Sequence, residues 1–329
     1  MLVTNDPALA APAVFAGRAF GIELTADFRV PGLLEPVAGR HARHRDERHI
    51  ELTLRDARRA NANWPAQSAI RTFELPAGDG RIVFTIDHEL SAGYRVWIAG
   101  LGQCVIAPGG DQIVCSPARG HDRWHLLIGQ ALPIAAALQG LEVLHASAVA
   151  FGSRAAAFVA PSGTGKTSLA LHLLAHGAGF LADDVVALEA DGEELLTHPG
   201  IGLAHAPSTE REALAAAGVG IGWPAASGRK RRVSVPLPGS PVPLRALYFL
   251  ERSRAVVAPE IVPIDPPDPC LLLGATFVSH VPTATRLVTQ LDICSRIART
   301  VPLFRVRSPI DGQAATQADL VARHFGTGT

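Results

Sequence analysis

The sequence has few cysteines and none of the marks of a secreted or membrane-spanning protein. Its 329 residues include 4 cysteines, which form no Cys-x-x-Cys pair and no cluster with zinc-site spacing. They are typical of the reduced thiols of an intracellular protein. No apolar run approaches the ~20 residues of a membrane-spanning helix. The N-terminus lacks the basic segment followed by an apolar segment that marks a signal peptide. The sequence therefore predicts a cytoplasmic protein with no membrane partner.

An excess of charge of either sign is also missing. Lys and Arg number 30 and Asp and Glu number 30, so the formal net charge is zero. Nothing in the overall charge favours nucleic acid as a partner. Charged residues make up 18% and hydrophobic residues 48%, which argues against global disorder and provides a sizeable core. This length suggests one large domain or two ordinary ones.

One stretch carries most of the functional signal, because a glycine-rich loop lies between a strand pattern and a helix pattern. Residues 155–159 are an apolar run with the length of a buried strand, and residues 168–176 form a helix pattern closed by Gly177. The loop and the first helical residue read Ala160, Pro161, Ser162, Gly163, Thr164, Gly165, Lys166, Thr167 and Ser168. Strand, glycine loop and helix in this order favour a phosphate-binding loop.

The residue types of this loop suit the triphosphate of ATP. Gly163 and Gly165 permit conformations in which successive N–H groups converge on phosphate oxygens, and the helix N-terminus adds positive potential. Lys166 would reach the β- and γ-phosphates, and the Thr167 hydroxyl would hold Mg²⁺. The first glycine of the usual pattern is Ala160 here, which is tolerable if its φ is negative. The alternative interpretation is a strand-to-helix turn without a ligand.

Two adjacent acids follow the loop helix. Asp183 and Asp184 lie within the apolar stretch 179–188, which we expect to be one strand. Buried carboxylates are costly unless they bind metal, form pairs or do chemistry. One of them could hold Mg²⁺ together with Thr167, and the other could take a proton from an attacking hydroxyl. The alternative is that both simply cap the end of a strand.

A histidine precedes the loop. Residues 141–151 read as a strand that turns at Gly152 and Ser153 into the strand before the loop, so His145 is expected beside the loop-bearing strand. It is a candidate catalytic residue, and the alternative is a satisfied core histidine.

The chain divides by pattern into two parts. Residues 50–116 alternate apolar and polar residues between Gly/Asp/Pro clusters, which predicts antiparallel hairpins. We therefore expect a smaller β-rich N-terminal domain over 1–120, and an α/β domain over 121–329 that carries the loop. Residues 123–138 predict a helix interrupted near Pro133. Residues 284–298 predict an amphipathic helix whose apolar face holds Leu287, Leu291 and Cys294.

A basic run lies in the second part of the chain. Arg229, Lys230, Arg231 and Arg232 are flanked by Gly228, Pro236 and Pro238. One interpretation is a solvated loop. The other is a mobile cationic loop that closes over the triphosphate or binds an acidic acceptor. We take the four basic residues as candidate substrate contacts.

Three of these stretches resemble the core motifs of the HPr kinase/phosphorylase family, in the same order and with matching spacing. They are His145–Val149, Pro161–Thr167 and Ala182–Asp184. The resemblance is close over residues 140–190 and loose over the rest of 120–320. It implies the compact P-loop kinase fold shared with phosphoenolpyruvate carboxykinases, Asp184 as the catalytic base and Asp183 as its support at the metal.

The chain departs from that family at two places. Ala146 follows the histidine where the bifunctional enzymes have glycine, and the nearest counterpart of their acidic glycine-rich signature, His198–Leu203, lacks the acid. These departures argue against phosphorylase activity and against HPr as the substrate. The stretches Phe20–Leu24, the Trp124 helix and Leu144–Ala148 instead resemble the HPr-kinase-like proteins encoded beside lasso-peptide and other peptide-modification genes.

The resemblance and the residues together predict an ATP- and Mg²⁺-dependent kinase. We expect it to transfer the γ-phosphoryl group to a Ser or Thr hydroxyl of a peptide or small protein, such as a ribosomally made peptide. The expected catalytic residues are Asp184, Asp183, His145 and Lys166. The alternatives are an HPr kinase/phosphorylase, a small-molecule kinase, or a nucleotide-binding regulator with little turnover. The sequence leaves a homo-oligomer open.

Overall fold

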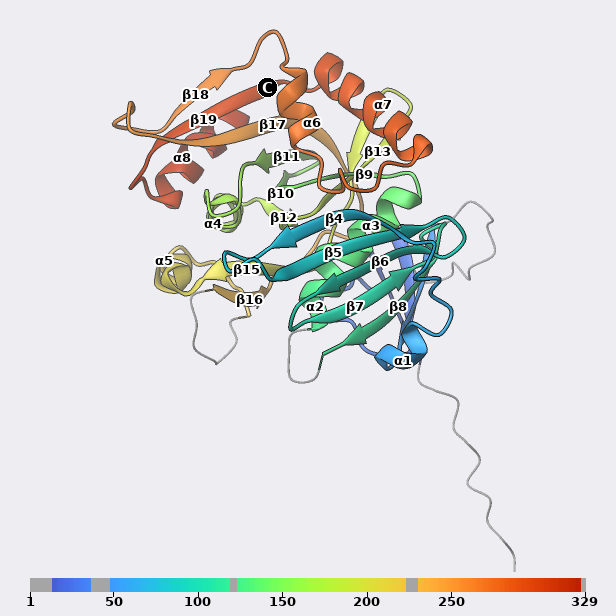
Figure 1. The fold of residues 1–329 in the computed structure, drawn as a ribbon. Helices are drawn as coiled ribbons and strands as arrows, with labels where there is room; N and C mark the ends of the chain where they lie inside the picture. The colour runs from blue at the N-terminus through green and yellow to red at the C-terminus, as the bar shows by residue number, and fades with distance from the viewer. Residues whose placement is uncertain (1–13, 37–47, 119–122, 223–229, 327–329) are drawn as a thin grey trace, which may run out of the picture.

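The computed structural model of the chain describes residues 14–36, 48–118, 123–222 and 230–326. It shows a mixed α/β protein with two large sheets and one two-stranded sheet (Figure 1). Among the described residues, no helix combines the length and the apolar composition needed to cross a bilayer.

The first sheet is formed by the N-terminal part of the chain. Its eight strands lie in the order β1-β2-β3-β8-β7-β6-β5-β4. They are β1 (Phe15–Ala19), β2 (Ile22–Ala26), β3 (His49–Leu54), β4 (Ile70–Pro76), β5 (Ile82–Glu89), β6 (Gly93–Ile98), β7 (Gly102–Ile106) and β8 (Gln112–Pro117), with the short helix α1 (Ala57–Ala60) after β3. The predicted antiparallel hairpins form from β4 to β8, but β3 runs parallel to both β2 and β8. A parallel pair requires a long connection, and residues 27–48 separate β2 from β3 along the chain.

One helical rod packs against this sheet. It consists of α2 (Arg123–Leu126), the π-helical turn η1 (Leu127–Ala131) and α3 (Leu132–Leu138). The predicted interruption therefore exists, and it is the π-helical turn immediately before Pro133. The buried faces of the sheet and of the rod share one core with Leu141, Val143, Val185 and Ile201. This core crosses the predicted domain boundary at residue 120.

The second sheet carries the glycine loop. Its strand order is β12-β10-β11-β17-β14-β13-β9, and β19 joins β17 to β18. The strands are β9 (Glu142–Leu144), β10 (Ala146–Phe151), β11 (Arg154–Val159), β12 (Gly179–Ala182), β13 (Val186–Asp191), β14 (Glu194–Thr197), β17 (Val242–Ser253), β18 (Glu260–Pro263) and β19 (Leu303–Pro309). Strand β18 forms within the proline-rich stretch 259–269.

Helices cover both faces of the second sheet (Figure 1). Helices α6 (Pro269–Gly274) and α7 (Ala284–Thr300) lie on one face, and α4 (Lys166–Leu173), continued by η2 (Leu174–His176), lies with α8 (Ala314–Gly326) on the other. Strand β11 alternates between the two resulting cores. The core under α6 and α7 takes Ala155, Ala157 and Val159. The core against α4 and α8 takes Ala156, Phe158 and Ala160.

Helix α7 presents a different face to the core from the one predicted. Leu287 and Leu291 are 42% and 61% exposed, whereas Arg286 and Gln290 are buried with Cys294. The reason is a buried polar network. Gln290 donates to the Thr276 hydroxyl, which donates to the Glu142 carboxylate, and the Arg286 guanidinium lies 3.6 Å from the same carboxylate.

We expect removal of Arg286 to be strongly destabilising. Glu142 and Arg286 are 0% and 2% exposed, and burial raises the pKa of Glu142 although Arg286 opposes the rise. Arg286→Met would leave the carboxylate buried without its cation, at a cost of about 3–5 kcal/mol in the free energy of unfolding. The double variant Glu142→Gln/Arg286→Met should recover much of this loss. Urea unfolding of both variants tests the expectation, and a single variant as stable as the double would contradict it.

The turn between β1 and β2 docks the first sheet onto the second part of the chain. The Phe20 N–H donates to the Pro199 carbonyl at 2.7 Å. Gly21 has a φ of +77°, and a Cβ there would lie 2.4 Å from the His198 ring. His198 contacts Glu189 at 2.8 Å, and Arg48 reaches Glu189 at 2.6 Å. The segment His198–Leu203 is therefore a docking segment for the N-terminal sheet.

The Glu189 cluster predicts a pH dependence of stability. Hydrogen bonds from His198, with further help from Arg48, lower the pKa of Glu189 from 4.5 to about 2. A lowered folded-state pKa contributes stability that is present above about pH 4.5 and is lost as the pH falls toward about 2. The contribution is at most about 3 kcal/mol. Glu189→Gln should flatten the unfolding free energy across this range. Parallel pH profiles for the wild type and Glu189→Gln would refute the assignment.

Candidate functional site

The glycine loop joins the end of β11 to the start of α4. Gly163 and Gly165 have φ values of 86° and 110°, which favour glycine. Among the described non-glycine residues, only Phe20 and Asp184 have positive φ, so Ala160 meets the condition set for its tolerance. The loop between Pro161 and Thr164 is closed by a backbone hydrogen bond of 3.3 Å.

Lys166 is folded back onto the loop. Its Nζ donates to the Ala160 carbonyl at 2.6 Å and lies 3.2 Å from Nε2 of His145. An ammonium group only donates, so His145 accepts through Nε2 and is neutral. Burial, with help from the Lys166 charge, lowers the pKa of His145. His145 lies between β9 and β10, and its backbone N–H donates to the Ala275 carbonyl at 2.7 Å.

The two acids do not lie inside one strand, as predicted, but between two. β12 ends at Ala182 and pairs with β10, whereas β13 begins at Val186 and pairs with β9 and β14. The chain turns between them, and Asp184 takes the left-handed conformation with φ 62°. Strand alternation therefore does not separate the two carboxylates, and both reach the same region of the molecule.

Asp183 is the most densely contacted acid of the site. Its Oδ1 accepts from the hydroxyls of Thr167 at 2.8 Å and Ser147 at 2.7 Å, and its Oδ2 accepts from the His205 N–H at 3.0 Å. Burial, and next the charge of Asp184, raise the pKa of Asp183. A nearby cation would favour the ionised form of Asp183 and so oppose both effects on its pKa.

The site offers oxygen ligands for a hard divalent cation. Ligand atoms of Asp183, Asp184 and His205 lie within 4.8 Å of one another, and the Thr167 hydroxyl touches Asp183. Carboxylate and hydroxyl oxygens suit Mg²⁺, which also keeps several waters. The residues therefore fit the predicted metal.

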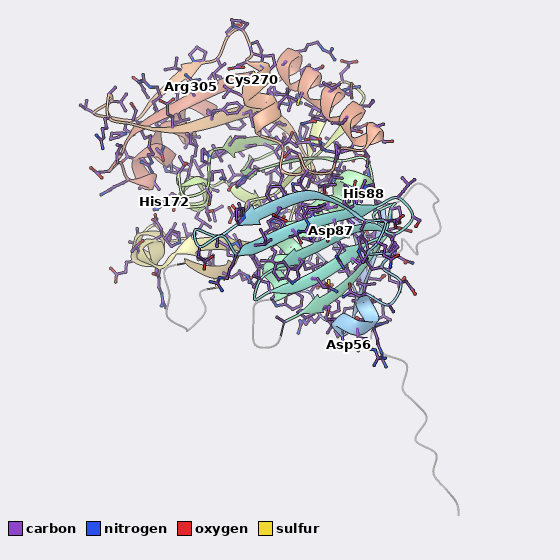
Figure 2. All side chains as sticks on the ribbon, in the orientation of Figure 1. Asp56, Asp87, His88, His172, Cys270 and Arg305 are labelled. Carbon is purple, nitrogen blue, oxygen red and sulfur yellow. The ribbon has the colours of Figure 1, made fainter. Side chains whose placement is uncertain are left out.

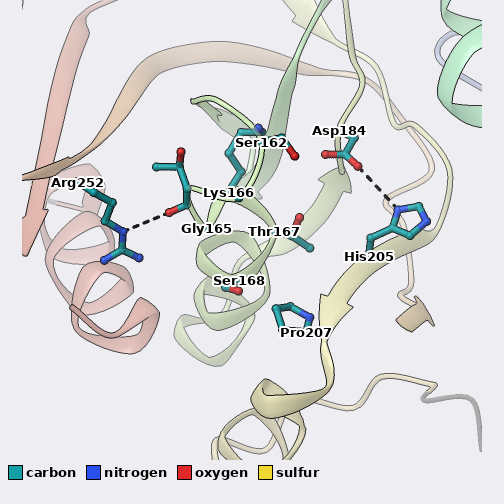
Figure 3. Close-up of a pocket in the computed structure, with 11 residues that line it drawn as sticks. Ser162, Gly165, Lys166, Thr167, Ser168, Asp184, His205, Pro207 and Arg252 are labelled. Atoms are coloured by element: carbon teal, nitrogen blue, oxygen red, sulfur yellow. Dashed lines mark hydrogen bonds and ion pairs between the residues drawn. The ribbon is translucent and has the colours of Figure 1, made fainter. Parts of the chain in front are cut away.

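A cavity of about 210 Å³ opens over the loop, and we call it the loop cavity (Figure 3). Its walls are Ser162–Ser168, Asp184, His205, Pro207 and Arg252. Sequence reasoning missed Arg252, which is in β17 and donates to the Thr164 carbonyl at 3.3 Å. Its two carbonyl contacts near the start of α8, to Pro309 and Gly312, hold it there. Position at the end of a parallel strand next to the loop strand was the available signal.

From Lys230 on, the basic run is part of a strand rather than a loop. β16 (Lys230–Ser234) pairs with β15 (Leu203–Pro207). The turn η3 (Ser208–Glu210) and helix α5 (Arg211–Ala216) lie between these two strands along the chain. Arg232 is directly opposite His205 and is half-buried, which lowers its pKa. Arg229 and the side chains of Lys230 and Arg231 lie outside what the structure describes.

Two further cavities border the site. The helix cavity is lined by the acid pair, Arg232, His205 and residues of α2 and η1, including Trp124 and His125. The third cavity opens on the α6 face of the loop and is lined by His145, Cys270 and Arg305; Figure 2 shows the last two near each other. His145 therefore lines the third cavity and Asp184 lines the loop cavity. Lys166 connects the two, because it contacts His145 and also lines the loop cavity.

The chain matches no protein-family model, and no curated protein matches it. Among solved structures it is similar to the HPr(Ser) kinase/phosphatase from Coxiella burnetii, with 14% sequence identity and a TM-score of 0.31. The match covers 56% of this chain and 97% of that one.

Proposed function

We propose that this protein is an ATP- and Mg²⁺-dependent kinase whose triphosphate site is the loop cavity. One observation carries the proposal: the Thr167 hydroxyl, at the start of the loop helix, donates to Asp183 at 2.8 Å. This contact joins the glycine loop to an acid of a neighbouring strand end, as phosphoryl-transfer sites require for a metal on the β- and γ-phosphates. Bound Mg²⁺ would neutralise charge on the phosphates.

The chain's own residues supply positioning and charge. Lys166 would exchange the Ala160 carbonyl for phosphate oxygens, and Arg252 provides a second cation in the lining of the cavity. Asp184 faces the cavity with a side chain 48% exposed, so a hydroxyl can reach it. We assign it as the base. The acceptor oxygen bonds to the γ-phosphorus, the bond to the ADP oxygen breaks, and the hydroxyl proton passes to Asp184.

His145 contacts Lys166 and not the loop cavity, so we propose a positioning role. A neutral imidazole at 3.2 Å holds the ammonium group at the base of the loop without competing for phosphate. The proposed acceptor is a Ser or Thr hydroxyl of a peptide or small protein.

The test is the fate of the γ-phosphoryl group. The full chain is incubated with Mg²⁺ and γ-labelled ATP, in separate reactions with a degenerate seryl-peptide library and with HPr. We expect acid-stable phosphoserine in the peptide fraction. Label in HPr alone would favour the HPr kinase alternative, and bound ATP with no label transfer would favour the regulator.

A further inference from the structure

Two of the four cysteines face each other across neighbouring strands of the first sheet. Cys104 lies in β7 and Cys115 in β8, and the register of this antiparallel pair places the two residues directly opposite one another (Figure 1). Their Sγ atoms lie 3.2 Å apart, and both thiols are free. They are 11 positions apart in the sequence, so only the register of the two strands reveals the contact.

The backbone hydrogen bonds of β7 and β8 define the kind of pair that the cysteines form. Opposed residues of antiparallel strands alternate between hydrogen-bonded pairs and non-hydrogen-bonded pairs, and side chains lie closer in the second kind. The Ala107 N–H donates to the Gln112 carbonyl at one end of the two strands, and the Ala118 N–H donates to the Leu101 carbonyl at the other. Alternation from either end makes the two cysteines a non-hydrogen-bonded pair.

This arrangement suits a disulfide. A disulfide joins residues whose Cα atoms are about 4.4–6.8 Å apart, and the Cα atoms of a non-hydrogen-bonded pair are about 4.5 Å apart. The register runs from Gly102 to Ile106 without a shift, so the two strands already hold the cysteines in facing positions. Formation of the bond therefore requires movement of the two side chains and no change of strand register.

Both thiols are buried in the core of the first sheet. Cys104 is 1% exposed and Cys115 is 6% exposed, and their core also contains Leu127 and Ala131 of η1. The hydrogen bond with Cys115, followed by burial, raises the pKa of the Cys104 thiol. Because the thiolate is the attacking species, these thiols react slowly in the closed sheet. Oxidation therefore requires a transient opening of the β7–β8 hairpin.

We propose that Cys104 and Cys115 are a modification site, at which a small disulfide such as glutathione disulfide oxidises the pair to a cross-strand disulfide. One cysteine thiolate attacks a sulfur of the oxidant and releases one glutathione thiolate. The other cysteine thiolate then attacks the mixed disulfide and releases the second. The cysteines lose two protons and two electrons, and the oxidant becomes two glutathione thiols. The site does not depend on the proposed kinase function.

The disulfide should stabilise the first sheet without altering nucleotide binding. It joins two neighbouring strands inside the sheet, in the order β3-β8-β7-β6. It also closes a short loop in the unfolded chain, and the lost entropy of that chain should raise Tm by about 3–6 °C. Among the described residues, none that lines the loop cavity lies in β7 or β8. The oxidised and reduced chains should therefore bind Mg²⁺-ATP with the same Kd.

Mass spectrometry of the full chain tests the proposal. The chain is incubated with about 1 mM each of oxidised and reduced glutathione, in urea below the unfolding transition so that the hairpin can open. The variant Cys270→Ser is used, because the exposed Cys270 thiol would otherwise add glutathione. We expect the chain to lose two hydrogen atoms. A peptide map without reductant should join the segments that carry Cys104 and Cys115, and treatment with dithiothreitol should lower Tm again.

Single replacements localise the bond. Cys104→Ala and Cys115→Ala should each abolish the loss of two hydrogen atoms. The matched control is Cys294→Ala, because Cys294 is the third buried thiol and its replacement should leave the disulfide intact. Urea unfolding in dithiothreitol checks that each variant is folded. The peptide map of the chain with both cysteines present decides the outcome even where a variant does not fold.

Three results would overturn the modification site. One is a chain that retains all its thiols after incubation. Another is a disulfide that joins any other two cysteines. The third is an oxidised chain whose Tm is equal to or below that of the reduced chain.

Discussion

Lys166→Ala is expected to lower phosphoryl transfer by at least about 10²–10³-fold, the usual loss when a charge-stabilising group is removed from a transition state. Lys166 is 4% exposed and projects from the loop helix toward the loop carbonyls, so no other side chain of the loop can take its position. Arg252 also lines the loop cavity and contacts the Thr164 carbonyl, so a second cation remains in the variant and some ATP affinity should survive.

The measurement is single-turnover transfer from γ-labelled ATP, with Lys166→Met beside Lys166→Ala to preserve the buried volume. Arg245→Gln serves as the charge-loss control on the same sheet. Urea unfolding checks that both loop variants are folded. Turnover of Lys166→Ala within a few-fold of the wild type would mean that the glycine loop does not hold the reacting phosphates.

The two acids should fail in different ways when each is replaced by asparagine. Asp184→Asn removes the proposed base, so transfer should fall by about 10²–10⁴-fold while ATP binding is retained. Asp183 accepts two hydroxyls and one backbone N–H, and an asparagine amide cannot accept all three. Asp183→Asn should therefore disturb Thr167 and raise the Mg²⁺ concentration required for activity.

Titration of Mg²⁺ against activity separates the two roles. Excess Mg²⁺ should restore part of the activity of Asp183→Asn and none of the activity lost in Asp184→Asn. Identical titration curves would contradict the division of roles between the acids, although they would leave a kinase with a shared carboxylate site.

Local signals made the loop predictable. The apolar run before Ala160, the glycines and the helix pattern from Ser168 all act within about twenty residues, and propensity and pattern report such short-range structure well. The mixed α/β character and the strand positions followed from the same kind of pattern. The parallel placement of β3 did not, because it depends on a crossover and on pairing with β8, far along the chain.

The errors arose where tertiary contacts override pattern. The stretch 179–188 is apolar enough for one strand. However, its first half pairs with β10 and its second half pairs with β9, and the chain turns at Asp184 between them. The buried face of α7 was predicted wrongly for the same reason. Arg286 is buried because its partner is Glu142 on β9, which is far from α7 in the sequence.

The residues that sequence reasoning missed around the site share one property. Arg252, His205 and His125 come from separate elements, and only the fold brings them beside the loop or the acids. An arginine at a strand end, or a histidine between alanines, has no local pattern that marks it. Arg232 was a candidate because of its basic neighbours, but its pairing opposite His205 required the β15–β16 register.

The loop cavity is expected to bind a nucleotide through its phosphates. Calorimetric titration of the full chain with ATP, ADP, AMP and adenosine, each with Mg²⁺, measures this binding. We expect one site per chain, with affinity falling as phosphates are removed and with adenosine bound weakly or not at all. Equal affinity for adenosine and ATP, or no binding of ATP, would contradict it.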